Sequence, residues 1–295
     1  MSNDLIGTIE AWSRDHPAVF ICGHNRSGTT RLHAVFQCSP QFVRSDGRVC
    51  ESALLRNLGE IDNWRSNEEL QNFLNVPAIE ACHFDTALGL TRDWPEEWRI
   101  PFLARAYFYS AVEHLGITRL AEKTPGHELH ASLLKHCFPR ARFVYLVRHP
   151  VDVVASIRGV LGRQTERGVD PELLRWWQMS AIDFTRRWRR SVAAGHLMHE
   201  ALPGEVMSVR YERFIEEPET VARQIFGFVG AAFDPAFLQS DLHAANWADW
   251  EPHLKEPIGD TGAHWSDHLG AADVEAIQSE LGDLMAAINY EPYPV

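Results

Sequence analysis

The sequence predicts an α/β fold in which a parallel central sheet is flanked by helices on both faces. Four short apolar runs each lead into a helical pattern, and this alternation is typical of parallel strands joined by right-handed crossovers. The runs are 18–22, 117–121, 142–148 and 206–211. With 295 residues and 45 % hydrophobic content, the chain can bury a full core. We therefore expect a single domain over residues 1–295 with a helical or irregular cap.

The first of these runs belongs to the stretch 18–39, AVFICGHNRSGTTRLHAVFQCS, which predicts a strand, a tight polar loop and a helix in that order. The helix is expected to begin at Thr29, because apolar residues then recur at three- and four-residue spacing. These residues are Leu32, Val35 and Phe36. The loop 23–28, GHNRSG, offers two permissive glycines, a cation, polar side chains and the bare N–H groups of a helix start. Such a loop favours anion binding.

The spacing within the loop is that of a phosphate loop, Gly-x4-Gly followed by two polar residues. A nucleoside-triphosphatase, however, needs a lysine at the position of Thr29. The positive charge lies instead inside the loop, at Arg26, and the loop ends in the hydroxyls of Thr29 and Thr30. A tight strand-to-helix turn without a ligand is the simpler alternative.

Between the strands, hydrophobic spacing predicts a series of helices. They are expected over 103–115, from Pro125, after His149-Pro150, over 170–202, from Pro218 and over 272–288. The pattern over 170–202 contains an arginine run, which we interpret as a solvated helix face, with a binding patch as the alternative. The run consists of Arg186, Arg187, Arg189 and Arg190.

Two stretches lack such periodicity. Residues 61–101 are dense in Trp, Asn and Glu, and residues 241–266 are rich in Trp, His and Gly. A loop as long as the second usually carries function. We interpret the first as a cap and the second as a loop that together shape a ligand pocket, although tryptophans packed under loops would also explain the cap.

The composition excludes several classes of protein. A net charge of −12 argues against a general nucleic-acid or anionic-membrane surface, because such partners favour distributed basic charge. The five cysteines are scattered and show no C-x-x-C pair, so we expect a reducing cytoplasm and no zinc site. A signal peptide and an apolar run of about 18 residues are both lacking, which predicts a soluble protein without a membrane span.

Three further stretches lie at the ends of predicted strands, where ligands of open α/β sheets bind. They are Glu122-Lys123-Thr124-Pro125, the segment RHPVDVVAS from Arg148 to Ser156, and Val209-Arg210-Tyr211-Glu212. Together with the loop pattern Gly-x-x-Arg-Ser-Gly-Thr-Thr, they occur in the order found in sulfotransferases that use 3′-phosphoadenosine 5′-phosphosulfate (PAPS). Over residues 18 to 230 the chain thus resembles this family, and most closely its bacterial type.

The resemblance implies roles for individual residues in binding the donor. The 5′-phosphosulfate would be held by the backbone N–H groups of Ser27, Gly28, Thr29 and Thr30 and by the side chains of Arg26, Thr29 and Thr30. Arg148 and Ser156 would hold the 3′-phosphate, and Tyr211 would lie against the nucleotide. Lys123 would be a second cation near the bridging oxygen and the moving sulfuryl group. Lys255 is the candidate in a basic loop that closes the nucleotide site.

An acceptor hydroxyl also needs a general base. The members of the family closer to this chain place a glutamate shortly after the loop helix, and Glu51 fits that position with a longer turn. As a first-turn carboxylate, Glu51 would equally well complement a helix dipole. His83 and His127 are the alternative bases.

The expected activity is transfer of a sulfuryl group from PAPS, which becomes 3′-phosphoadenosine 5′-phosphate (PAP), to a hydroxyl or amine. The acceptor would be a small molecule, a carbohydrate or a lipid-like compound, and no metal is expected. Fixed cations and helix-start N–H groups supply the charge stabilisation that in-line displacement needs. The alternatives are a divergent phosphate-loop kinase, disfavoured by Thr29, and a catalytically idle nucleotide-binding protein.

Overall fold

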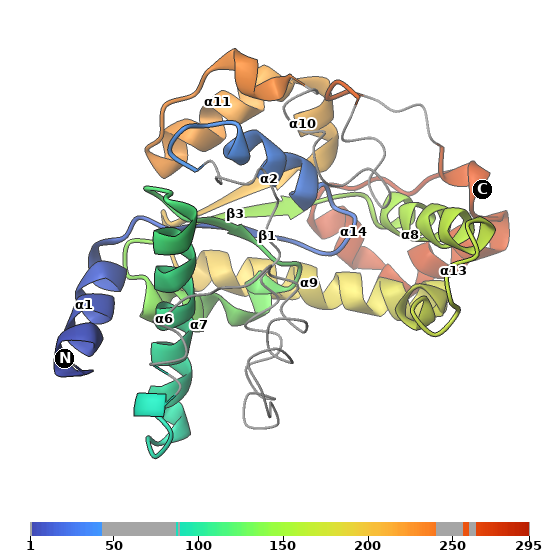
Figure 1. Ribbon diagram of the computed structural model, residues 1–295. Helices are drawn as coiled ribbons and strands as arrows, with labels where there is room; N and C mark the ends of the chain where they lie inside the picture. The colour runs from blue at the N-terminus through green and yellow to red at the C-terminus, as the bar shows by residue number, and fades with distance from the viewer. Residues whose placement is uncertain (1, 43–86, 88, 240–255, 260–263, 295) are drawn as a thin grey trace.

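The computed structural model describes residues 2–42, 87, 89–239, 256–259 and 264–294. At its centre is a four-stranded sheet in the order β2-β1-β3-β4, and every pair of neighbouring strands is parallel (Figure 1). The strands are β1 (Val19–Cys22), β2 (Ala121–Lys123), β3 (Arg142–Val147) and β4 (Val206–Arg210). The predicted parallel sheet is therefore confirmed.

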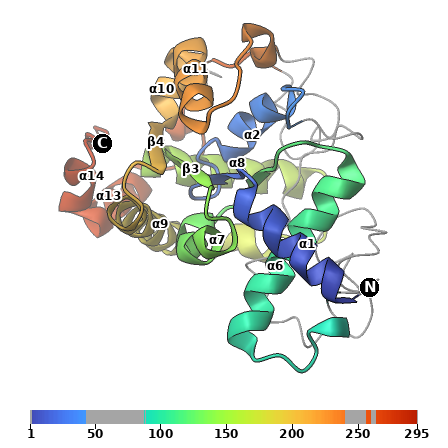
Figure 2. The same ribbon diagram turned by 90° about the vertical axis from the view of Figure 1, so that its left-hand side faces the viewer.

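Helices cover both faces of the sheet, as Figure 1 and Figure 2 show together. One face carries α2 (Thr29–Gln37), α10 (Tyr211–Glu216) and α11 (Pro218–Val229). The other carries α6 (Glu96–Leu115), α7 (Ala131–Cys137) and α9 (Ala181–Ala201). Successive strand residues point to opposite faces, so that Phe20 packs with α6 and α7 while Ile21 packs with α2 and α11. Burial on both faces explains why these strands read as continuous apolar runs.

The remaining elements surround this core. They are α1 (Ser2–Asp15), α8 (Pro150–Glu166), α13 (Ala271–Leu281), α14 (Asp283–Ala287) and the short 3₁₀ helices η2 (His127–His130), η3 (Arg175–Gln178), η4 (Pro235–Leu238) and η6 (Trp265–Asp267). A separate apolar cluster joins α8, α9, α13 and α14 beside the sheet. Within the ranges given above, no helix combines the length and the apolar character needed to span a membrane.

The structure corrects the predicted position of the second strand. It was expected over 117–121, but β2 comprises Ala121–Lys123, and Lys123 is its last residue. Glu122 and Lys123 are almost fully buried in the strand, and two charged residues do not give an apolar signal. The strand is held in place by β1 and by the Nε2 atom of His33 in α2, which donates to the carbonyl of Ala121 at 2.8 Å.

Several helix limits also differ from the predicted ones. α6 begins at Glu96, so Pro101 lies inside this helix and not in an irregular segment before it. The missing hydrogen bond is offset by burial of the residues that follow, Phe102 and Leu103. The rest of the predicted cap up to residue 86, and most of the 241–266 loop, lie outside the described residues.

Three predicted helices are divided. The helix expected from Pro125 consists of η2 followed by α7. The pattern over 170–202 is interrupted before α9, whose first turn is capped by the Ser180 side chain. The helix expected over 272–288 is broken at Gly282, which adopts a φ of 50° between α13 and α14. Hydrophobic spacing does not report such local breaks.

Burial keeps a histidine neutral where α1 meets the sheet. Nε2 of His16 accepts a hydrogen bond from the backbone N–H of Leu120 at 3.0 Å, and its ring lies 4.4 Å from that of Trp12. Burial, together with the nearby charge of Arg119, lowers the pKa of His16 to about 4. Protonation of Nε2 would also remove the acceptor for the Leu120 N–H group. The contact between the end of α1 and the sheet therefore requires the neutral form of His16.

This histidine should make the protein less stable in acid. In the unfolded chain it takes up a proton below its usual pKa of 6.5, whereas the native state resists protonation down to about 4. Between these values the free energy of unfolding falls as the pH falls, by about 2 kcal/mol at pH 5 from this group. Urea unfolding of the His16→Gln variant, which keeps an acceptor, should show a correspondingly weaker loss between pH 7.5 and 5.

The exposed His196 on α9 provides the control. The His196→Gln variant should lose stability in acid as steeply as the unaltered protein. An unchanged pH dependence in the His16→Gln variant would show that His16 is not the buried neutral group described above.

Candidate active site at the carboxyl edge of the sheet

The loop between β1 and α2 has the geometry of an anion-binding loop. Arg26 adopts a left-handed φ of 69°, and Gly28, with a φ of 89°, directly precedes α2. α2 has no side-chain cap at this end. The Ser27 hydroxyl is buried, and no hydrogen-bond partner is found for it in the described part of the chain. The predicted strand, loop and helix are thus confirmed, and the loop offers a buried hydroxyl beside an uncapped helix start.

Four residues predicted to bind the donor come together next to this loop. Nη1 of Arg148, at the end of β3, donates to the backbone carbonyl of Arg26 at 3.1 Å. Nε of Arg26 donates to the hydroxyl of Ser156 on α8, also at 3.1 Å. The Arg148 guanidinium lies 4.4 Å from the ring centroid of Tyr211, the first residue of α10. We call Arg26, Arg148, Ser156 and Tyr211 the arginine cluster.

The backbone at Arg148 is fixed from a second direction. Its carbonyl accepts a hydrogen bond from the indole Nε1 of Trp188 at 3.0 Å, and this tryptophan is buried in α9. The guanidinium therefore contacts the loop on the α2 side, while the main chain of the same residue is held from the α9 side.

The segment 289–294, which we call the C-terminal strap, supports the same region. Glu212 accepts hydrogen bonds from the His149 backbone N–H and from the Tyr290 hydroxyl, both at 2.8 Å. The Tyr293 hydroxyl donates to Asp152 at 2.8 Å, and its ring stacks on that of His149 at 3.9 Å. Burial raises the pKa of both tyrosines, so the hydroxyls remain donors at neutral pH. The strap holds the residues that directly follow Arg148.

The end of β2 places charged residues on the two faces of the sheet. Lys123 is fully buried and in register with Ile21, so it lies on the α2 face. Glu122 is in register with Phe20, on the opposite face. Its carboxylate accepts from the Thr124 hydroxyl at 2.8 Å and contacts Nε2 of His127. His127, proposed above as an alternative base, is thus engaged by a buried carboxylate.

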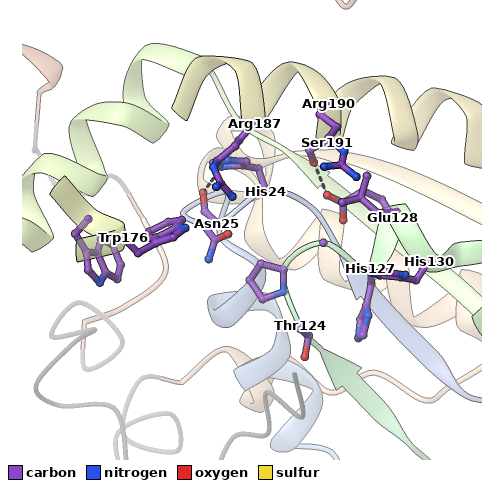
Figure 3. A pocket seen from close by; sticks show the side chains of 14 residues that line it. His24, Asn25, Thr124, His127, Glu128, His130, Trp176, Arg187, Arg190 and Ser191 are labelled. Carbon is purple, nitrogen blue, oxygen red and sulfur yellow. Dashed lines mark hydrogen bonds between the residues drawn. The ribbon is translucent and has the colours of Figure 1, made fainter. Parts of the chain in front are cut away.

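A cavity of about 580 Å³ lies on the α9 face of this edge (Figure 3). Its wall is formed by residues from the loop, from the segment after β2, from η3 and from α9. They are His24, Asn25, Thr124, Pro125, Gly126, His127, Glu128, Leu129, His130, Trp176, Trp177, Arg187, Arg190 and Ser191. Such a volume is in the range of small-molecule pockets.

The loop and the cavity wall are joined by Glu128. One carboxylate oxygen accepts from the backbone N–H of Gly23 at 3.0 Å, and the other accepts from the Ser191 hydroxyl at 2.6 Å. Next to it, Nδ1 of His24 donates to the carbonyl of Asn25 at 2.8 Å. Burial lowers the pKa of His24 to about 4, and the charge of Arg187 contributes to this shift. The His24 ring is therefore neutral at physiological pH, with its proton on Nδ1.

Comparison with known proteins identifies the family. A sequence model described as "Sulfotransferase family" matches residues 17–235, which include the loop, the end of β2, the β3–α8 segment and the start of α10. This chain belongs to the sulfotransferase family.

Individual relatives of this sulfotransferase are distant in sequence. Protein-tyrosine sulfotransferase A of Caenorhabditis elegans is 23% identical over 96% of the chain and 70% of its own length. The protein-tyrosine sulfotransferase of Drosophila melanogaster is 22% identical over 97% of the chain, which spans 54% of that protein.

Solved structures support the fold. The sulfotransferase domain from the curacin biosynthetic pathway superposes with a TM-score of 0.56 at 18% identity, covering 95% of this chain and 100% of that domain. Mouse sulfotransferase SULT7A1 complexed with PAP gives a TM-score of 0.51 at 11% identity, covering 98% of this chain and 91% of that one.

Not every predicted site residue can be placed. Glu51, His83 and Lys255 lie outside the described residues. The nearest described neighbour of Lys255 is Glu256, whose backbone carbonyl accepts from Nη1 of Arg31 in α2 at 2.7 Å.

Sequence reasoning missed Glu128 and the two tyrosines of the strap, and it named the arginines of the cavity wall only as part of the run on α9. For the arginines a signal existed. Arg190 follows Arg187 by three residues and Ser191 follows it by four, and residues at these spacings lie on the same face of a helix. For Glu128 and the strap there was none, because their partners are far away in the sequence.

The close contact between Tyr211 and Gly28 gives a test of the site geometry. A Cβ atom on Gly28 would lie 2.2 Å from Cδ2 of Tyr211, and the positive φ at this position strains any other residue. The Gly28→Ala variant should therefore lose about 1–3 kcal/mol of stability to urea.

Gly162 in α8 is the matched control, because a Cβ there meets nothing within 4 Å. The Gly162→Ala variant should keep its stability or gain up to about 1 kcal/mol, since alanine favours a helix. If Gly28→Ala were as stable as Gly162→Ala, the Tyr211 ring could not lie against the loop as described.

Proposed function

We propose that this chain is a PAPS-dependent sulfotransferase that transfers a sulfuryl group to a hydroxyl or amine of a small-molecule, carbohydrate or lipid-like acceptor. The observation that carries the proposal is the arginine cluster. It joins the loop, β3, α8 and α10 at the edge where ligands of open α/β sheets bind. The fold shared with a sulfotransferase complexed with PAP supports the choice of donor.

The loop suits the 5′ end of the donor. The buried Ser27 hydroxyl has no protein partner among the described residues, and the uncapped start of α2 directs N–H groups to the same place. Gly28 allows the Tyr211 ring to pack directly against the loop, because a Cβ atom at this position would collide with that ring. The backbone of Ser27, Gly28, Thr29 and Thr30 would then hold the 5′-phosphosulfate together with the side chains of Arg26, Thr29 and Thr30.

The 3′-phosphate would bind to Arg148 and Ser156, and Tyr211 would pack against the nucleotide. Arg148 lies between the loop carbonyl and the Tyr211 ring, so its guanidinium is already oriented at the strand end. Ser156 lies within hydrogen-bond distance of Arg26. Guanidinium groups and hydroxyls are suitable donors to a dianionic phosphate.

Lys123 and a carboxylate would complete the chemistry. PAPS supplies the sulfuryl group on a phosphate–sulfate anhydride, which needs no redox step. The Lys123 ammonium, at the end of β2, would stabilise the charge that develops on the bridging oxygen. Because His127 is engaged by Glu122, Glu51 is our preferred base for the acceptor proton, with His83 as the alternative.

We place the enzyme in the cytoplasm because its cysteines are few, scattered and odd in number.

The donor site is tested by nucleotide binding. The Arg148→Gln variant should bind PAP about 10- to 100-fold more weakly, because one charge-assisted contact to phosphate is lost. The affinity of this variant for AMP, which has no 3′-phosphate, should fall several-fold at most, because only the contact between residue 148 and Arg26 is loosened. Isothermal titration with both nucleotides measures the difference.

Arg213 on α10 provides the control, since it is 53% exposed and pairs with Glu217. The Arg213→Gln variant should bind PAP as the unaltered protein does. An equal loss of PAP and AMP affinity in Arg148→Gln would contradict the 3′-phosphate role. A protein that binds neither nucleotide would contradict the proposed function.

The role of Lys123 is tested by turnover. The Lys123→Met variant keeps the apolar stem of the side chain and removes the charge, so transfer from radiolabelled PAPS to the best acceptor of a phenol panel should fall about 10²- to 10³-fold. PAP affinity, which also reports correct folding, should change much less. The Lys135→Met variant, which removes a half-buried lysine paired with Glu205 at 2.7 Å, should transfer normally. Unchanged turnover in Lys123→Met would rule out this assignment.

A further inference from the structure

The four arginines of α9 form two pairs with different surroundings. Arg186 and Arg189 contact the carboxylate of Glu280 on α13 at 3.2 and 3.7 Å. Arg187 and Arg190 line the cavity instead, and no carboxylate of the described residues forms an ion pair with either, although the charge of Arg187 acts on the exposed Asp183 one turn earlier in α9. In Figure 3 both side chains extend from the helix toward the loop and the segment after β2. All four side chains are exposed, so the interpretation of the run as a solvated face agrees with the structure, and Arg187 and Arg190 additionally form part of the cavity wall.

Among the described residues that line the cavity, Glu128 is the one acidic side chain beside this second pair, and both of its oxygens already accept hydrogen bonds from Gly23 and Ser191. Burial is the main cause of the lowered pKa of His24 and of His130, and the charges of Arg187 and Arg190 contribute to these two shifts respectively. In a chain of net charge −12, such a cationic wall is a local feature.

Another part of the cavity wall is aromatic. Trp176 and Trp177 of η3 are half-buried, and their rings meet edge to face at 4.8 Å. The ring of Trp176 also meets that of Phe184 edge to face, with 5.1 Å between the ring centroids. Rigid indole surfaces beside guanidinium groups suit a flat apolar body that carries a negative charge.

The cavity lies at the same edge of the sheet as the residues proposed for transfer, although the Lys123 side chain is on the other face. His24 and Asn25 of the cavity wall directly precede Arg26 in the loop, and Thr124 directly follows Lys123. We propose that the cavity binds the acceptor, and that this acceptor is a small phenol with an anionic group held by Arg187 and Arg190. This inference rests on the proposed function and narrows its acceptor class to anionic aromatic compounds.

The test compares two acceptors that differ only in charge, 3-(4-hydroxyphenyl)propionate and its amide. With saturating PAPS, kcat/KM for the acid should exceed that for the amide at least tenfold. The Arg187→Gln and Arg190→Gln variants should each raise KM for the acid about tenfold, and the double variant should lose the preference. In these three variants, kcat/KM for the amide should differ less than threefold from that of the unaltered protein. The Arg189→Gln control, on the Glu280 side of α9, should keep the preference.

Binding of the acid to the protein, with and without PAP, separates this inference from the proposed function. Calorimetric binding that depends on Arg187 and Arg190 supports the anion site even if no sulfuryl group is transferred. Equal use of acid and amide, or a preference that survives in the double variant, would overturn the inference while transfer itself stands. Failure of the acid both to bind and to react would overturn it as well, whatever the nucleotide titrations show.

Discussion

The buried carboxylate of Glu128 is the constraint on which the site depends. A charge with 4% exposure is tolerated only when its oxygens are well hydrogen-bonded, and here the partners are the Gly23 amide and the Ser191 hydroxyl. The first of these begins the loop, and the second belongs to the cavity wall. One residue thus sets the distance between the place where a donor would bind and the place where an acceptor would bind. A shift of α9 would be transmitted directly to the loop.

Arginines that donate to backbone carbonyls also connect distant segments of the chain. Arg148 contacts the loop carbonyl of Arg26, and Arg119 donates to the carbonyls of Pro17, Val229 and Gly230. Each guanidinium joins segments that are more than one hundred residues apart in the sequence. A guanidinium has five donors in a fixed plane, which makes it suited to holding several chain ends at once. Side chains held in this way lose little further freedom when they meet a ligand, and such preorganisation favours both binding and catalysis.

Features that depend on interactions between residues close together in the sequence were predicted correctly, and features that depend on distant residues were not. The loop and three of the four strands were predicted correctly, because glycine positions, apolar runs and helical spacing are local signals. β2 was misplaced because its residues are charged, and their burial depends on Phe20 and Ile21 in the neighbouring strand. Arg187 is exposed as expected, but its place in a cavity wall could not be predicted, because only the placement of η3 and of the segment after β2 makes a cavity of that helix face. The roles of Glu51 and Lys255 stay predictions from resemblance.

The C-terminal strap has a consequence for how the protein is made. Tyr290 and Tyr293 hold Glu212, Asp152 and His149, yet the ribosome adds them long after the sheet and the loop have been synthesised. A nascent chain can pair its four strands while the segment beside Arg148 still lacks these contacts. Domains tend to fold from the N-terminus during translation. The edge that carries Arg148 would therefore be the last region to mature, and a chain cut short before residue 290 would resemble the finished fold without its fixed edge.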